Sequence, residues 1–298
     1  NTLISMYAKC GALEKAEKLH TELCFRDRVS WNVLIGGYAQ HERGEEALDC
    51  FERMQSEGFS PNEVTFVCIL KACCSTCAIE NGRNIHNEIV AKGFLERNIV
   101  LGNALVDMYA KCDALVDAKQ VHGKLYMRDI VSWSSLITGY AKQGQGHEAM
   151  TYFEKMQRKG LSPDEVTFLC VLGAFSNSGL SDEAEMLFGD MSRTYGLTPC
   201  IQHHIWMIVV FGYGGHFDKA ISVIKVMPCT DCLAVWVALL GACRKWANVM
   251  LGTVAFDQIT QLDCTCATAY VLMCSIFASA GMHEDAENVE TMRLKYAS

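Results

Sequence analysis

The sequence predicts an all-α fold, organised as an α-α superhelical solenoid of helical-hairpin repeats. The five residues Met-Tyr-Ala-Lys-Cys at 6–10 return at 108–112, so the chain repeats itself after 102 residues. Within this block two further sets of residues recur every 31–36 residues, and apolar side chains follow the helical period. One hairpin cannot bury its apolar face alone, so neighbouring hairpins must stack.

Two sets of recurring residues define the units. The first set consists of small residues, which indicate where two helices approach too closely for a larger side chain. Its steps are 31, 35, 36, 31, 35, 36, 32 and 34 residues, and its members are Ala16, Ala47, Gly82, Ala118, Ala149, Ala184, Ala220, Gly252 and Ala286. The second set has the same eight steps near the start of each unit, at Asn1, Asn32, Val67, Asn103, Ser134, Leu169, Ile205, Val237 and Val271.

Each unit is expected to form two helices joined by a turn. In 28–62 the first apolar stripe begins at Trp31 and follows the spacing i, i+3, i+4, i+7. Gly44 separates it from a second stripe that begins at Ala47. The unit closes with Gly-Phe-Ser-Pro at 58–61, which places Gly just past the helix end and Pro beyond it.

Composition favours an ordered chain in a reducing compartment. Half of the 298 residues are apolar and only four are Pro. No apolar run approaches the ~20 residues that span a bilayer, so we expect no membrane segment. Several of the 16 Cys recur with the repeat, as Cys10 and Cys112 do, and are predicted to pack as small apolar residues. The sequence begins inside a unit without an initiator Met, so we expect a piece of a longer protein.

Charge distinguishes the two halves of the chain. Residues 1–164 hold 19 Lys and Arg against 21 Asp and Glu, a net charge of −2. Residues 165–298 hold 7 against 13, a net charge of −6. The overall net charge of −8 argues against indiscriminate binding of nucleic acid. We therefore expect the two halves to contact different partners.

Specific motifs resemble one family of helical repeats. A fixed period of ~34 residues would resemble tetratricopeptide repeats. The 35-36-31 alternation, with the repeated motifs MYAKC, VSW (29–31 and 131–133) and SP[N/D]EVTF (60–66 and 162–168), resembles the plant pentatricopeptide-repeat family of the PLS type. The resemblance implies a repeat tract over 1–200, with units 1–27, 28–62, 63–98, 99–129, 130–164 and 165–200, then a degenerate short repeat over 201–232 and an E-type repeat-like region over 233–298.

The resemblance implies that each unit reads one nucleotide of single-stranded RNA. The readers are the fifth residue of the first helix and the last residue of the unit. An ionised Asp only accepts hydrogen bonds and suits the ring N–H of U or G, whereas Asn can donate to the ring nitrogen of C or A. A long Asn at the fifth position favours a pyrimidine, and a short Ser leaves room for a purine. The implied pairs are Asn1 with Asp27, Asn32 with Asn62, Val67 with Asn98, Asn103 with Asp129, and Ser134 with Asp164.

Read from 5′ to 3′, these pairs imply the site U-Y-N-U-G, where Y is a pyrimidine and C is favoured. Helix capping is an alternative for the last residue of each unit, because it immediately precedes a helix. That alternative is weaker at the fifth position, where Asn lies inside a helix and is unfavourable without a purpose.

Two further sets of site residues follow from the resemblance. The second residue of each unit is implied to sandwich bases, although packing at a helix start would also explain it; these residues are Val29, Val64, Val100, Val131 and Val166. The lysines at the thirteenth position are implied to contact phosphates, which gives affinity without sequence information, unless they are simply solvated; these are Lys9, Lys111 and Lys142.

From Leu169 onward the equivalent pairs, such as Leu169 with Cys200, offer little hydrogen bonding to a base. Residues 165–298 are therefore expected to continue the scaffold and to dock a protein. The resemblance to the E region implies a specificity factor for C-to-U RNA editing in a mitochondrion or chloroplast, with the deaminase supplied by a partner or a further domain. The alternative function is a tetratricopeptide-like scaffold for protein–protein interaction.

We predict no catalytic residue, no metal and no cofactor, so the chain is not expected to be an enzyme. The zinc-deaminase signature has partial matches at 86–88 and 228–232. They lie about 140 residues apart in different helical units, so coincidence is the better interpretation. A four-thiolate zinc site built from Cys229, Cys232, Cys264 and Cys266 is the remaining metal hypothesis.

Overall fold

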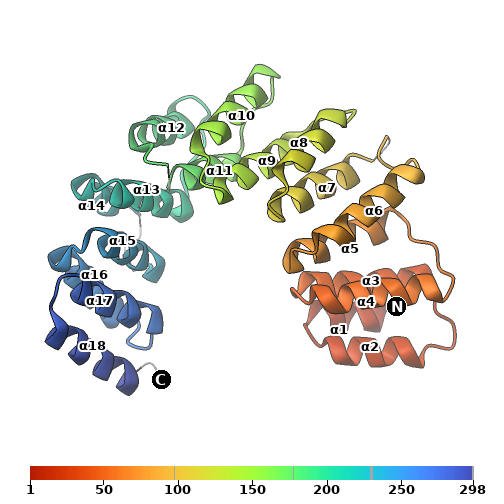
Figure 1. Ribbon diagram of the computed structural model, residues 1–298, viewed down its shortest axis with the longest axis horizontal. Coiled ribbons are helices and arrows are strands. Elements are labelled where there is room, and N and C mark those ends of the chain that lie inside the picture. The colour runs from red at the N-terminus through yellow and green to blue at the C-terminus, as the bar shows by residue number, and fades with distance from the viewer. Residues whose placement is uncertain (97, 177, 229–230, 297–298) are drawn as a thin grey trace. The chain divides into compact units, whose positions relative to one another are not determined.

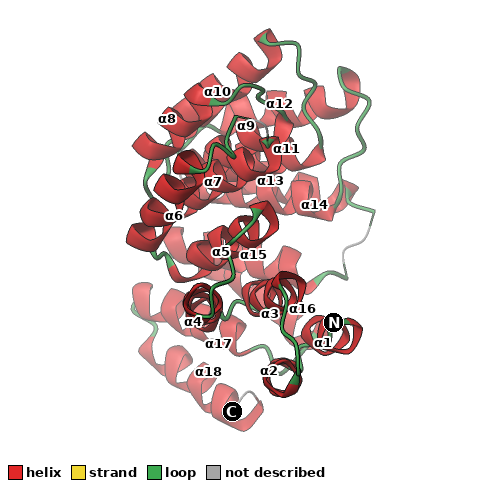
Figure 2. Cartoon of the chain, turned by 90° about the vertical axis from the view of Figure 1, so that its right-hand side faces the viewer, coloured by secondary structure: helices red, strands yellow, loops and turns green. Residues whose placement is uncertain are grey.

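The computed structural model describes residues 1–96, 98–176, 178–228 and 231–296. Within these residues all regular secondary structure is helical, as Figure 2 shows, so the predicted all-α fold class is confirmed. The chain divides into two compact units, residues 1–143 and 144–298. The division falls in the turn between two helices of one expected repeat.

The helices of the first unit are α1 (Thr2–Lys9), α2 (Leu13–Glu22), α3 (Arg28–Gln40), α4 (Gly44–Ser56), α5 (Glu63–Thr76), α6 (Ile79–Ala91), α7 (Ile99–Lys111), α8 (Leu115–Lys124) and α9 (Ile130–Lys142). Those of the second unit are α10 (Gly146–Arg158), α11 (Glu165–Phe175), α12 (Ser181–Arg193), α13 (Ile201–Tyr213), α14 (Phe217–Val226), α15 (Leu233–Trp246), α16 (Val249–Leu262), α17 (Ala267–Ser279) and α18 (His283–Tyr296).

In the first unit the helices alternate between two rows (Figure 1). The first helices of the hairpins, α1, α3, α5, α7 and α9, each contact the next in the row. Each second helix packs against its own partner and against the first helix of the following hairpin. In the second unit α11, α13, α15 and α17 contact in sequence, and α10, α12 and α16 each pack against the first helix that follows them. Within each unit, neighbouring hairpins thus cover each other's apolar faces.

The small residues lie where helices approach closely, as predicted. Ala16, Ala47 and Ala118 are fully buried. At Gly82 an added Cβ would stand 2.6 Å from Met108 Sδ, closer than van der Waals contact allows. In the last helix, Ala286 is only half-buried. The recurring small side chains therefore set the spacing between helices.

Two consecutive residues, an Arg followed by an Asp, link neighbouring hairpins at two equivalent places in the chain, 26–27 and 128–129. Arg26 Nε donates to the His20 carbonyl oxygen at 3.3 Å, and Arg128 Nε donates to the His122 carbonyl oxygen at 2.7 Å. Each guanidinium thus satisfies a carbonyl at the C-terminal end of a second helix. The Asp that follows begins the next first helix.

The same two histidines are buried against tryptophans. The ring centroids of His20 and Trp31 lie 4.3 Å apart, and those of His122 and Trp133 lie 4.5 Å apart, both in edge-on arrangements. Burial, with a smaller contribution from the nearby arginine, lowers the pKa of both imidazoles, that of His122 to about 4. At neutral pH they are therefore uncharged aromatic packing groups between hairpins.

The described cysteines are free thiols. Cys112 is half-buried, and its Sγ lies 3.5 Å from the Cys73 carbonyl oxygen of α5, the helix before its own in the row. The prediction that Cys10 also packs is wrong, because α1 has no such neighbour in the described residues and Cys10 is exposed. No helix in the described part of the chain has the length and apolar character to cross a membrane.

Ala118→Leu should destabilise the protein by about 1–3 kcal/mol, because a filled helix contact has no room for the added atoms. Val116→Leu on the same helix is the control, since Val116 is 66% exposed; its effect should stay within about 0.5 kcal/mol. Chemical denaturation of both variants measures the difference. Equal denaturation midpoints would contradict the proposed close approach at Ala118.

Acidification should destabilise the protein through His122. The unfolded imidazole titrates near its ordinary pKa of 6.5, whereas the folded one binds a proton only near 4. The contribution is therefore fully present above pH 6.5 and is lost as the pH falls towards 4, by about 3 kcal/mol at most. His122→Phe should reduce this pH dependence in denaturation at pH 7.5 and 4.5. A variant with the wild-type pH dependence would exclude His122 as its source.

Candidate nucleic-acid interface

The last residue of each of the first five expected repeats caps the helix that follows. Each side chain accepts a hydrogen bond from the backbone N–H of the third helical residue, at distances of 2.7–3.1 Å. Such a bond satisfies one of the otherwise unpaired N–H groups of the first turn. The capping residues are Asp27, Asn62, Asn98, Asp129 and Asp164. The capping alternative is therefore correct at all five.

Three of the capping side chains also contact the fifth-position residue with which they were paired. Asn1 Nδ2 lies 3.3 Å from both carboxylate oxygens of Asp27. Asn103 Nδ2 lies 3.0 and 2.9 Å from those of Asp129. Capping and pairing are therefore not exclusive, because one carboxylate does both.

The third of these pairs consists of two amides. Asn32 Nδ2 donates to Asn62 Oδ1 at 3.2 Å, and both side chains are half-buried. Neighbouring first helices bring the partners together, since Asn32 lies on α3 and Asn62 caps the start of α5, which packs against α3.

The pairs differ in the groups they leave for a ligand. The Ser30 backbone N–H, together with the Asn1 amide, lowers the pKa of Asp27 below its ordinary value, so this carboxylate is ionised and accepts only. Asn103 is 8% exposed, and its Oδ1 has no hydrogen-bond partner among the described residues. A buried acceptor without a partner is costly. The Asp27 carboxylate is therefore an accessible acceptor, whereas Asn103 Oδ1 is an acceptor without a partner that the protein encloses.

The remaining implied readers are characterised by their burial and by the helix on which each lies. Ser134 is buried on α9 in the first unit, and Asp164 caps the start of α11 in the second. Asn98 and Val67 are both half-buried, and Asn98 begins α7.

The five valines are exposed. Each is the second residue of a first helix and is 52–58% exposed, namely Val29, Val64, Val100, Val131 and Val166. Packing at a helix start would bury these side chains, so that alternative is wrong. The structure instead places an accessible apolar group next to every capping residue.

The three lysines do not share one environment. Lys9 and Lys142 are exposed, and Lys142 Nζ lies 3.5 Å from the Lys111 carbonyl oxygen. Lys111 Nζ forms an ion pair with Asp107 at 2.7 Å. Its charge is therefore already partly neutralised, which makes it a weaker phosphate contact than the other two.

A groove along α1, α3 and α5 collects several of these groups. Lys9 and Asn32 line it, and so do Gln40 and Lys71. Lys71 was not among the predicted residues because its counterpart 102 residues later is Gly173, so no repeat revealed it. The groove thus joins a fifth-position amide to two cationic side chains.

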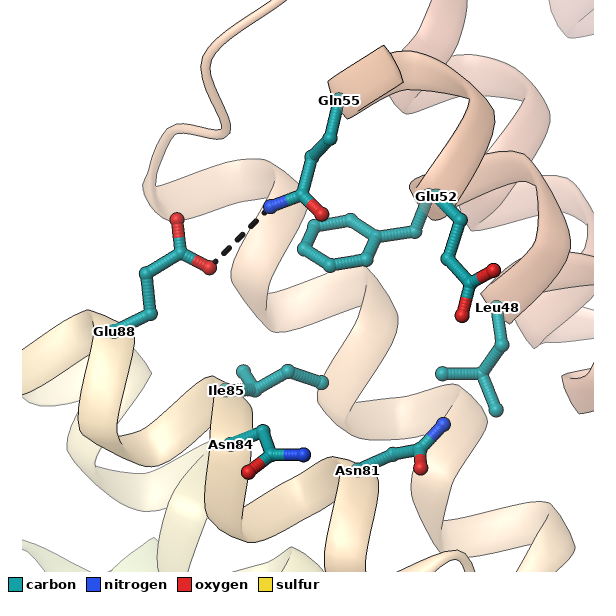
Figure 3. Close-up of a pocket in the computed structure, with 8 residues that line it drawn as sticks. Leu48, Glu52, Gln55, Asn81, Asn84, Ile85 and Glu88 are labelled. Carbon is teal, nitrogen blue, oxygen red and sulfur yellow. Dashed lines mark hydrogen bonds between the residues drawn. The ribbon is translucent and has the colours of Figure 1, made fainter.

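A different pocket, shown in Figure 3, lies between α4 and α6. Gln55 Nε2 donates to Glu88 Oε2 across it at 3.4 Å, and Glu52 also lines it. Two carboxylates and no basic side chain line this pocket, so its charge would repel a phosphate. It holds none of the predicted site residues.

The His and Glu of the first partial metal motif have partners within the first unit. His86 Nδ1 lies 2.9 Å from the Tyr109 hydroxyl, and Glu88 forms an ion pair with Lys92 at 3.0 Å. Cys229 lies outside the described residues. Among those described, no group of three or more His, Cys, Asp or Glu side chains could hold a metal ion.

Asp129→Ala should destabilise the first unit by about 1 kcal/mol, because α9 loses its capping acceptor. Asp129→Asn keeps an acceptor oxygen, as Asn62 does at the start of α5, and should cost only a few tenths of that. Thermal and chemical denaturation of the two variants measure the difference. Equal destabilisation by both would show that the carboxylate charge, rather than the cap, matters.

Comparison with known proteins gives consistent matches. A family model described as PPR repeat family matches residues 26–75 and 128–177, and one described as PPR repeat matches residues 1–26 and 166–193. A mitochondrial pentatricopeptide repeat-containing protein of Arabidopsis thaliana is 35% identical over 98% of this chain and 46% of its own length. The chloroplastic protein CRR2 of the same plant is 37% identical over 98% of this chain and 44% of its own length.

A solved structure also resembles the chain. The pentatricopeptide repeat protein PPR10, in complex with an 18-nucleotide psaJ RNA element, matches with a TM-score of 0.80 at 22% identity, over 99% of this chain and 45% of its own. PPR10 of maize, described without RNA, matches with a TM-score of 0.68 at 21% identity, over 99% of this chain and 44% of its own. The chain spans less than half of the length of each of these proteins.

Proposed function

We propose that this chain, which carries pentatricopeptide repeats and is similar to plant pentatricopeptide-repeat proteins over nearly its whole length, binds single-stranded RNA in a sequence-specific manner. The observation that carries the proposal is the recurring site at the junctions between repeats. There a fifth-position Asn is hydrogen-bonded to the capping residue, beside an exposed Val. Neither capping nor packing requires this combination.

The chemistry of each pair suggests the base it takes. Asn103 and Asp129 present acceptor oxygens, which suit the ring N–H of uracil. Asn1 and Asp27 have the same composition and the same contact. With the three other pairs, the proposed site remains U-Y-N-U-G. The exposed valines would lie against the base faces, and Lys9 and Lys142 would contact phosphates.

The RNA bound by PPR10 supports an RNA partner for this chain. Relatives named as mitochondrial or chloroplastic support an organellar setting. The PLS-type alternation and the E-type region at 233–298 support a narrower role as specificity factor for C-to-U editing. In that role the acidic C-terminal region would dock the protein that supplies a deaminase.

A protein–protein scaffold is the second candidate. The apolar residues at the fifth position after 168, Leu169, Ile205, Val237 and Val271, favour it for the second unit. Both functions fit one chain if RNA is read by the first unit and the start of the second. If the chain failed to bind RNA, the protein–protein scaffold would be the remaining candidate function.

Asn103→Ala combined with Asp129→Ala should weaken binding to a U-Y-N-U-G oligonucleotide about tenfold, because one base loses its contacts. Preference at the fourth nucleotide should disappear while the other preferences remain. Fluorescence anisotropy with a set of oligonucleotides varied at that position measures both.

Asn248→Ala is the matched control, since Asn248 caps α16 at 3.1 Å and lies outside the proposed reading site. It should cost similar stability and leave RNA binding unchanged. A wild-type protein that binds the complementary sequence equally well would exclude sequence-specific reading.

A further inference from the structure

We infer that Thr65 is a specificity-determining residue, which makes the Asn32/Asn62 pair prefer cytosine to uracil. The inference rests on the proposed function, because it concerns the base that this pair reads. It assigns a role to the third residue of a first helix, which lies outside the pair itself.

The Thr65 hydroxyl lies between the two amides. Its Oγ1 is 2.6 Å from Asn32 Oδ1 and 2.9 Å from Asn62 Oδ1. It also accepts the Asn62 backbone N–H at 3.1 Å, so its own hydrogen is free to donate. One O–H donates a single proton, and the shorter distance identifies Asn32 Oδ1 as the acceptor. Thr65 is fully buried, so no water competes for this position.

One backbone group fixes the orientation of both amides. The Thr65 N–H points at the Asn62 side chain at 3.0 Å, and only an oxygen can accept it. Asn62 therefore presents Oδ1, and Asn32 must present its Nδ2 to that oxygen at 3.2 Å. The Oδ1 of Asn32 then faces the Thr65 hydroxyl. Turning Asn62 over would set its Nδ2 against the Thr65 N–H, two donors, and turning Asn32 over would set its Oδ1 against Asn62 Oδ1, two acceptors.

Both amide oxygens of the pair consequently already accept hydrogen bonds within the protein, two at Asn62 Oδ1 and one at Asn32 Oδ1. Donors now outnumber acceptors: the second N–H of Asn32 and the two of Asn62 have no other partner among the described residues, against one remaining lone pair on Asn32 Oδ1. Donors match the unprotonated N3 of cytosine and oppose the N3–H of uracil. The pair is thus set to accept cytosine.

The Asn103/Asp129 pair shows the opposite arrangement. Ser132 holds the helix position of Thr65, but its Oγ donates to the Asp129 main-chain oxygen at 2.9 Å. Asn103 Oδ1 therefore stays without a partner in the described structure. Ser30 likewise donates to the Asp27 main-chain oxygen, at 2.8 Å. Of these three hydroxyls, the one on Thr65 alone contacts the fifth-position amide.

Thr65→Val tests the inference, because it removes the hydroxyl, keeps the branched volume and frees Asn32 Oδ1 to accept from uracil. Two oligonucleotides that differ only in C or U at the second position are compared by fluorescence anisotropy. The wild type should bind the C form about tenfold more tightly, the factor that 1.4 kcal/mol represents at 25 °C. In Thr65→Val the two affinities should agree within about twofold. Thr65→Ser keeps the hydroxyl and should keep the preference.

Ser30→Ala is the matched control, since Ser30 exchanges the same capping bonds with Asp27 and makes no hydrogen bond to Asn1 in the described structure. It should lower the melting temperature without changing any base preference. Thr65→Ala gives the same test as Thr65→Val if the valine variant does not fold by circular dichroism.

A hydroxyl-free variant that retains the tenfold preference, or Thr65→Ser without it, overturns the inference and leaves the proposed function intact. A wild type that binds RNA with no base preference at any position overturns both. A wild type selective elsewhere but indifferent to C and U at the second nucleotide overturns the inference alone.

Discussion

The described site depends on one hydrogen bond, which recurs at the starts of α3, α5, α7, α9 and α11. In it the N–H of the third helical residue donates to the last side chain of the preceding repeat. It begins the helix, so it fixes which residues face the neighbouring helix. It also holds a carboxylate or amide at one place beside the preceding first helix. A capping residue without a fixed position could not form a defined pair with the Asn one repeat earlier.

The small residues provide the second constraint. Because Ala or Gly occupies the close approaches, successive hairpins pack tightly enough for side chains of neighbouring first helices to meet. The buried His–Trp contacts and the Arg side chains that bond the ends of second helices then hold one hairpin against the next. The polar pairs are thus supported by apolar packing that is itself repetitive. Such support lets the paired residues vary without altering the scaffold.

The fold could be predicted closely because the repeat supplies many copies of the same evidence. The two sets of recurring residues predicted helical hairpins, and the structure shows them. The residues paired through the family resemblance contact each other at Asn1, Asn32 and Asn103. The sequence could not show that capping and pairing belong to the same side chain, because both require an Asn or Asp at one position.

Other details depend on which atoms meet, and residue type does not reveal them. Thr65 and Ser132 occupy equivalent positions, yet the hydroxyl of Ser132 donates to the Asp129 main-chain oxygen at 2.9 Å, whereas that of Thr65 contacts two amides. Lys111 recurs with Lys9 but is engaged by Asp107, which has no acidic counterpart at Ser5. Cys10 is exposed for a similar reason, since its environment differs from that of Cys112.

The central claim is that consecutive repeats read consecutive bases through these pairs. Selection of bound RNA from a fully randomised pool, followed by sequencing, tests it without assuming a target. The account predicts enrichment of U-Y-N-U-G, with C more frequent than U at the second position and no preference at the third. Failure to enrich any sequence would contradict it. An enriched sequence that does not favour C at the second position and U at the fourth would contradict it as well.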